Sequence, residues 1–427
     1  MTDAPAAAGA ASGPASGPGP ASGRTPQDYE TAASRESAVA AFDVKAKSPL
    51  DHFQHFLHAN PTAAPIMVLA LSVAVFAATA NNFLTAFNLS LIIQQVTVIG
   101  LLGAAQTLII LTAGIDLSVA AIMVLSYMIM ARLGVEGGAP DVVAVLIGLG
   151  AGLACGLFNG ALVTRMRVVP VIVTAAATVA LLTLAGLSVI WAAPVGILLG
   201  LAAGGAAMSG KLPAGPSMQF RLPPFIATLG AWSIFAALSL WYSGGQTVRS
   251  QSIDAEASLL KVFGLRVEIL GAQFTYGSFL MVLVFAGLWY VLNWTGWGRA
   301  VYAIGDDKEA AELSGIRTDR VLLSVYAVSG TLCALAGWAA IGRVGSASPQ
   351  SFAEGNLDAI TAVVIGGTSL FGGRGAVFGT LFGALIVGVF RSGLSLSGFD
   401  PLWQSFAVGL LIIVAVALDQ WIRRVSA

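Results

Sequence analysis

The sequence predicts an all-α polytopic membrane protein, and three observations lead to that fold class. Of the 427 residues, 57% are hydrophobic and only 10% are charged, and the mean hydropathy is +0.84. Soluble chains carry about 25% charged residues, so this composition is typical of a protein in lipid. Apolar runs long enough to cross a bilayer follow one another from residue 62 onward. Between residues 52 and 131, Asp116 is the only formally charged side chain.

The first 60 residues differ in kind from the rest. The opening stretch MTDAPAAAGAASGPASGPGPASG has almost no large apolar residue, so it buries too little surface to offset chain entropy. We therefore expect a disordered or interfacial cytoplasmic tail over 1–60 and a transmembrane domain over 61–427. The tail has no basic start followed by an apolar core, which argues against a cleavable signal peptide. Its three histidines, in DHFQHFLH, favour an amphipathic surface segment over a metal site.

Twelve membrane spans are expected, of which one is marginal in length. They fall at 62–80, 89–113, 117–133, 142–164, 171–190, 192–208, 224–243, 275–293, 321–341, 358–371 (the marginal one), 375–394 and 403–422. With both termini in the cytoplasm, 15 of the 21 Lys and Arg residues fall on the cytoplasmic side. That asymmetry is the one expected of an inner-membrane protein with this orientation.

Several patterns exclude other functions or predict packing. Zero net charge gives no basic field for nucleic acid, and the two cysteines lie in apolar runs without metal or disulfide spacing, so no cofactor is expected. GAAMSGK (205–211) has the spacing of a phosphate-binding loop, but Leu212 replaces the required Ser or Thr.

Glycines at every fourth position in GLGAGLACGLFNGA, and again at 375, 379 and 383, predict close helix packing, within the chain rather than between two copies.

One charged loop, 296–320, interrupts the apolar pattern. In GDDKEAAELSG, Asp306 and Asp307 can cap a short helix with Glu309 in its first turn, and Gly315 can end it. The helix is expected to lie exposed on the cytoplasmic face, either as a solvated connector or docked in a partner's groove. The candidate docking residues are Asp306, Asp307, Glu309, Ala310, Ala311, Glu312 and Gly315.

Three motifs in order, QTLIILTAGIDLS, YAIGDDKEAAELSGI and AITAVVIGGTSLFGGRGAVFGTLFGALIVG, resemble the permease subunits of bacterial ATP-binding-cassette (ABC) importers for monosaccharides. The resemblance covers roughly 61–423 and is strongest to the fructose branch of the ribose, xylose and fructose group. It implies a homodimer of permeases, a cytoplasmic ABC ATPase subunit contacting loop 305–315, and a periplasmic sugar-binding protein. The permease itself would be non-catalytic and would need no cofactor.

The same resemblance implies ten spans, two fewer than the apolar runs predict. Removing 171–190 and 192–208 leaves ten, so we predict an inserted two-span hairpin within 168–220. RVVPVIVT (167–174) and RLPPFIAT (221–228) share Arg, Pro, Ile and Thr, which indicates a local duplication or insertion. Either copy could begin the helix that lines the pathway, and the second is favoured.

Asp116, with Ser118 in the same motif, is unexpected in an apolar run, because placing an acidic side chain in hydrocarbon costs roughly 2.5–3.5 kcal/mol. We favour a structural cap on the following span, with backbone N–H groups near Ser118 and Val119 as donors. A gating position on the pathway and a proton-relay acid are the alternatives. The residues that could line a sugar pathway, each equally able to form a bond between helices, are Gln94, Gln95, Gln106, Thr107, Asn159, Thr228 and Trp232.

Taken together, these features predict a transporter subunit that works by alternating access, driven by a partner ATPase. The alternative is a stand-alone ion-coupled secondary transporter, which would be expected to place ionisable groups at the midplane of broken helices. An intramembrane enzyme is disfavoured because the spans hold no Ser/His, paired-carboxylate or metal constellation.

Overall fold

The computed structural model describes residues 60, 62–164, most of 178–199, 222–269 and 271–423. The chain divides into two units, Met1–His52 and Phe53–Ala427, and everything below concerns the second. The expected tail (1–60), the predicted hairpin (168–220) and the segment 205–211 lie wholly or largely outside the described residues.

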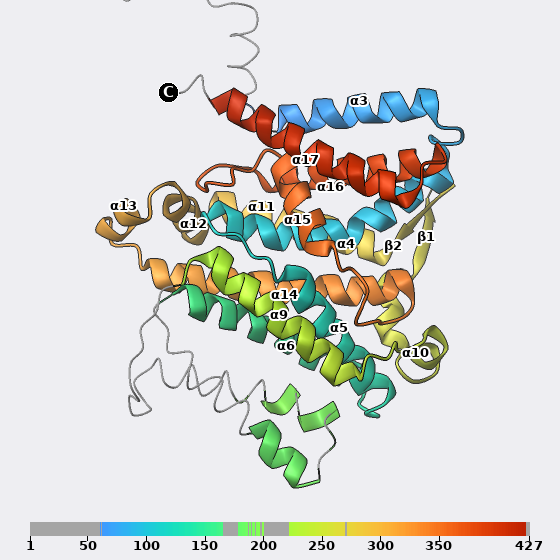
Figure 1. Cartoon of the computed structure of the whole chain (residues 1–427), viewed down its shortest axis with the longest axis vertical. Helices are drawn as coiled ribbons and strands as arrows, with labels where there is room; N and C mark the ends of the chain where they lie inside the picture. The colour runs from blue at the N-terminus through green and yellow to red at the C-terminus, as the bar shows by residue number, and fades with distance from the viewer. Residues whose placement is uncertain are drawn as a thin grey trace, which may run out of the picture. The chain divides into compact units, whose positions relative to one another are not determined.

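Helices make up most of the described chain (Figure 1). In order, the structure contains α3 (Ala63–Thr79), α4 (Ala86–Leu111), α5 (Val119–Val135), α6 (Asp141–Val163), α9 (Pro224–Ser243), α10 (Ser250–Glu256), the 3₁₀ helix η1 (Ser258–Gly264), β1 (Arg266–Ile269), β2 (Ala272–Thr275), α11 (Tyr276–Trp294), α12 (Gly296–Asp306), α13 (Lys308–Leu313), α14 (Thr318–Val344), α15 (Gly355–Ile365), α16 (Val377–Leu396) and α17 (Pro401–Arg423).

Each expected span outside 171–208 overlaps one of these helices. Among the described residues, six helices are long and apolar enough to cross a membrane, namely α4, α6, α9, α11, α14 and α16, and α3, α5 and α15 are apolar but shorter. A helical, polytopic architecture is therefore confirmed in outline. The number of crossings and the orientation of the termini stay predictions.

Two stretches depart from the expected pattern. The marginal span at 358–371 is a helix of only 11 residues, α15, because left-handed Gly367, Gly372 and Gly373 turn the chain after it. Between α9 and α11 the chain forms α10, η1 and an antiparallel pair of strands, in which Arg266 faces Thr275 and Ile269 faces Ala272. The fold is thus helical with one small β-hairpin. In Figure 1 this hairpin lies at the end of the helix bundle opposite to α12 and α13.

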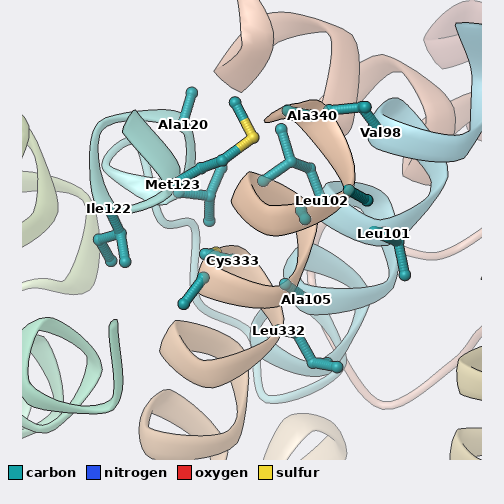
Figure 2. Close-up of a cluster of buried hydrophobic side chains, with 14 of the residues drawn as sticks. Val98, Leu101, Leu102, Ala105, Ala120, Ile122, Met123, Leu332, Cys333 and Ala340 are labelled. Carbon is teal, nitrogen blue, oxygen red and sulfur yellow. The ribbon is translucent and has the colours of Figure 1, made fainter. Parts of the chain in front are cut away.

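Helix α14 occupies the centre and packs against α4, α5 and α6. Figure 2 shows side chains from three of these helices meeting, with Leu102 of α4, Met123 of α5 and Cys333 of α14 among them. Where such apolar side chains surround the backbone, its polar groups have no water to bond, and regular helices satisfy them internally.

The glycine ridge of α6 explains how α14 approaches so closely. A Cβ at Gly156 would stand 2.2 Å from the backbone oxygen of Tyr326, and a Cβ at Gly330 would stand 2.2 Å from the backbone oxygen of Gly152. On α16, a Cβ at Gly383 would stand 1.9 Å from the backbone oxygen of Ala362 in α15. The prediction that both ridges pack within the chain is confirmed.

Candidate functional site: a buried polar cluster and an exposed capped helix

The connector between α4 and α5, residues 112–118, is the first unusual segment. Helix α4 ends at Leu111, and Ala113 takes a left-handed conformation (φ 59°) that is rare for a residue with a side chain. The N–H of Gly114 returns to the oxygen of Ile109 (3.1 Å) and closes the helix end. The connector then runs inward, so that Asp116 is only 1% exposed.

The Asp116 carboxylate is held by three donors. Its Oδ1 accepts from the backbone N–H and from the hydroxyl of Ser118, each at 2.6 Å, and its Oδ2 accepts from the amide nitrogen of Asn159 at 3.1 Å. The same amide nitrogen donates to the Ser118 hydroxyl oxygen (2.7 Å). Among the described residues no salt bridge reaches Asp116. In this part of the chain, hydrogen bonds rather than a cation keep the acid inside the protein.

Side chains from three other helices satisfy the connector's backbone. With its amide oriented to match its partners, Gln106 of α4 donates to the Asp116 oxygen (3.0 Å) and accepts from the Asp116 N–H (3.2 Å). On α9, the Thr228 hydroxyl oxygen accepts from Leu117 N–H (3.2 Å), and it lies 3.0 Å from the oxygen of Ile115. The side-chain oxygen Oδ1 of Asn356 in α15 accepts from the backbone N–H of Ala120, just after the connector (3.1 Å).

We call these six residues the polar cluster: Gln106, Asp116, Ser118, Asn159, Thr228 and Asn356. As expected, the Asp116 carboxylate accepts from the backbone N–H of Ser118 at the start of α5. The backbone N–H of Ala120, in the first turn of α5, instead donates to the side-chain oxygen of Asn356. Sequence reasoning did not single out Asn356. The only available signal was an amide at the start of an apolar run.

The remaining pathway candidates lie elsewhere. Thr107 bonds to the oxygen of Gly103 and to the hydroxyl of Thr380 on α16, both at 2.7 Å. Gln94 donates to the oxygen of Gln273 in β2 (3.0 Å), Gln95 is half-buried, and Trp232 is 40% exposed on α9. The seven candidates therefore form no single lining within one copy of the described chain.

Helix α13 is short, capped and exposed. The Asp307 carboxylate accepts from the backbone N–H groups of Glu309 (2.9 Å) and Ala310 (3.0 Å). At the other end Gly315 is left-handed (φ 85°), and the N–H of Ile316 returns to the oxygen of Ala311 (3.1 Å). The expected cap and stop are both present.

The structure corrects two details of the expected docking surface and adds one residue. Asp306 is not a cap, since it is the last residue of α12, and Ala311 faces inward against Ile304 and Leu322. Leu313 was not expected there, yet it is 91% exposed beside Glu309, Ala310 and Glu312, which are also exposed. Leu313 thus adds an apolar side chain to the surface that the sequence predicts for docking of a partner.

A backbone joint links this helix to the connector. A Cβ at Gly305, in the last turn of α12, would stand 1.8 Å from the oxygen of Leu111, the last residue of α4. The N–H of Gly373, in the turn after α15, donates to the same oxygen (3.0 Å), and a Cβ at Gly372 would stand 2.7 Å from the N and Cβ atoms of Ala113. Three glycines therefore let α12 and the 366–376 turn touch the start of the connector directly.

Comparison with known proteins agrees with this arrangement. The family described as "Branched-chain amino acid transport system / permease component" matches residues 171–416, more than half of the chain. The chain belongs to this permease family. It is 48% identical to the fructose import permease protein FrcC of Rhizobium meliloti over 403 residues, 94% of this chain and 97% of the relative.

Other relatives carry different sugars in their names. The permease is 34% identical to the ribose import permease protein RbsC of Bacillus subtilis (86% of this chain, 95% of the relative) and 31% identical to the xylose transport system permease protein XylH of Escherichia coli K12 (82% and 88%). No solved structure matches it significantly. The resemblance to monosaccharide ABC importers is confirmed, and the chain is a multi-pass sugar permease of the fructose, ribose and xylose type.

Proposed function

We propose that this permease carries fructose across the bacterial inner membrane as one of two identical membrane subunits of an ABC importer. A cytoplasmic ATPase would bind α13, and a periplasmic sugar-binding protein would deliver the sugar on the opposite side. The observation that carries the substrate is the 48% identity to the fructose import permease over nearly the whole of both chains. Both termini and α13 then face the cytoplasm, in keeping with the excess of Lys and Arg there.

The backbone joint supplies the mechanism. Because Gly305 and Gly373 contact Leu111 without intervening side chains, displacement of α13 by the ATPase moves the end of α4. That end begins the connector whose polar cluster ties together α4, α5, α6, α9 and α15. A close-packed joint passes such a displacement on because it deforms little. The helices would then shift together and change the side to which the pathway opens.

In this account the cluster members are joints between helices, while the pathway runs along surfaces that two copies enclose. Gln106, Asn159 and Thr228 already have partners inside the chain and are fully buried. Weak contact with sugar along the pathway is sufficient for conduction, so specificity would rest mainly with the sugar-binding protein.

The test is uptake of labelled fructose in cells that carry the permease with its ATPase and binding protein, and in cells that lack only the ATPase. The proposal expects uptake that requires the ATPase and is competed best by unlabelled fructose, with ribose and xylose weaker. Uptake that survives without the ATPase but falls with the proton or sodium gradient would contradict it. The protein would then be an ion-coupled transporter, with Asp116 as the first residue to change.

A further inference from the structure

Helix α15 begins inside the helix bundle rather than at its edge. It packs against α16 and α4, and a Cβ at Gly355, its first residue, would stand 3.6 Å from Leu102 Cδ1. Leu102 lies about 14 Å along the axis of α4 from its end at Leu111 and about 24 Å from its start at Ala86. Because α4 is long and apolar enough to cross a membrane, α15 starts at membrane depth.

Charged side chains gather at that start. Glu354, directly before α15, is exposed and forms no ion pair within the described part of the chain. One turn further on, the Asp358 carboxylate accepts from the guanidinium of Arg391 on α16 at 2.6 Å. This pair is only partly covered, since 32% of the Arg391 side chain is exposed. Leu357 shares the helix face of Glu354 and is 58% exposed.

This charged surface does not suit contact with lipid. A charge in hydrocarbon is costly, so ionisable side chains at membrane depth face the interior of a bundle or a water-filled cavity. The exposed face of α11 shows the contrast, because it presents apolar side chains such as Leu283, which is 69% exposed. Glu354 and Arg391 therefore border water. In a permease, the water-filled space at this depth is the pathway of the substrate.

We propose that Glu354, Asp358 and Arg391 form the outer monosaccharide site of the pathway, with Leu357 beside them against the C–H groups of the ring. The inference rests on the proposed function, which supplies the sugar class and makes this side the periplasmic one. The two carboxylates accept from sugar hydroxyl groups, and the guanidinium donates to them. Because Glu354 and Arg391 stay open to water, the site holds sugar weakly, as conduction requires.

Cysteine labelling tests the site directly, because the two cysteines of the chain, Cys155 and Cys333, are buried. Leu357→Cys places a thiol on the site and leaves its charged groups unchanged. Leu283→Cys places one on the exposed face of α11 and is the matched control. In the complete transporter in liposomes, a charged thiol reagent that cannot cross lipid is added on the side of the binding protein. It should label Leu357→Cys at least about tenfold faster, because the reactive thiolate forms in water and not in lipid.

Protection by sugar identifies the ligand. Fructose at high concentration should slow the labelling of Leu357→Cys, while glycerol at the same concentration should not. Adding Glu354→Gln should raise the fructose concentration needed for half-protection about three- to tenfold, because the amide keeps the size of the side chain but loses its charge. Glu268→Gln, the same change at an exposed position of β1, should leave protection unaltered.

The possible outcomes separate this inference from the proposed function. Equal labelling of the two cysteine variants, or no protection by fructose, ribose or xylose, would overturn the site. If Leu357→Cys resists the reagent and instead crosslinks to its counterpart in a second copy, the surface is a contact between copies and the proposal is wrong. Protection by ribose or xylose but not by fructose would support the site and count instead against fructose as the substrate.

Discussion

Two aspartates in this permease use the same local hydrogen bond in opposite surroundings. Asp116 and Asp307 each accept from the backbone N–H two residues further along, at 2.6 Å and 2.9 Å. Asp307 is exposed, and its bonds stay within α13. Asp116 is buried and bonds also to Asn159 of α6. An aspartate at a helix start therefore becomes a joint between helices only where burial removes water as a competing partner.

The largest effect is expected when the two aspartates are removed in turn. Asp116→Ala removes the acceptor of the Ser118 N–H and hydroxyl and one of the two acceptors of the Asn159 amide in the interior, at a cost on the order of 3 kcal/mol. Asp307→Ala removes only a cap in contact with solvent and costs about 1 kcal/mol, confined to α13. Thermal unfolding of the detergent-purified proteins should show a clear fall for the first and almost none for the second. Asp116→Asn, which keeps one acceptor oxygen, should fall between them. Equal unfolding temperatures for the two alanine variants would contradict the claim that Asp116 joins helices whereas Asp307 caps only α13.

A smaller effect is expected on the exposed helix α13, which carries Asp307. Leu313→Ser should leave the unfolding temperature unchanged, because the side chain is 91% exposed. It should weaken binding of the partner ATPase about tenfold, since an apolar anchor at an interface centre contributes more than its charged neighbours. Leu84→Ser is the matched control, because Leu84 is also exposed and lies just before the start of α4, far along that helix from its contact with α12. Unchanged ATPase affinity in Leu313→Ser would place the docking surface elsewhere.

The smallest effect concerns the stop of α13. Gly315 has φ 85° with open space around it, so Gly315→Ala costs about 1 kcal/mol from backbone strain alone. Hydrogen exchange of the amides from 308 to 315 should become several-fold faster, while the rest of the chain stays unchanged. Gly287→Ala also meets open space but has no left-handed backbone, and it should change nothing. Equal exchange in the two variants would show that the stop does not depend on glycine.

Much of the fold could be predicted from the sequence, because in lipid a long apolar run has few choices besides a helix. Residues 224–243 were predicted as a span and form α9 with the same bounds. The cap at Asp307 and the stop at Gly315 follow from local rules that hold on a solvated loop. The hairpin of β1 and β2 was missed although RVEI and AQFT alternate polar and apolar residues, because two runs of four residues are too short for the alternation to stand out beside the long apolar spans.

The candidate site could be predicted only in part, because its members come together through tertiary contacts. Polar residues in apolar spans indicated Gln106, Asn159 and Thr228, but nothing in the sequence showed that all three meet at residues 115–118. Gly305 was not recognised either. A glycine in a helical, charged loop gives no sign that its missing side chain makes room for the end of another helix.

The coupling of ATP hydrolysis to sugar import in Gly305→Ala tests the central claim most directly. Its control is Gly296→Ala at the start of the same helix, where the nearest atom to a new Cβ is the Arg299 guanidinium nitrogen at 3.8 Å. In the reconstituted complete transporter, Gly305→Ala should still hydrolyse ATP but import at least about tenfold less fructose per ATP, because a Cβ forces α12 away from Leu111. Gly296→Ala should keep the ratio of the unchanged protein. If Gly305→Ala imports fructose at that same ratio, the joint does not carry the coupling, and the mechanism proposed for this permease is wrong.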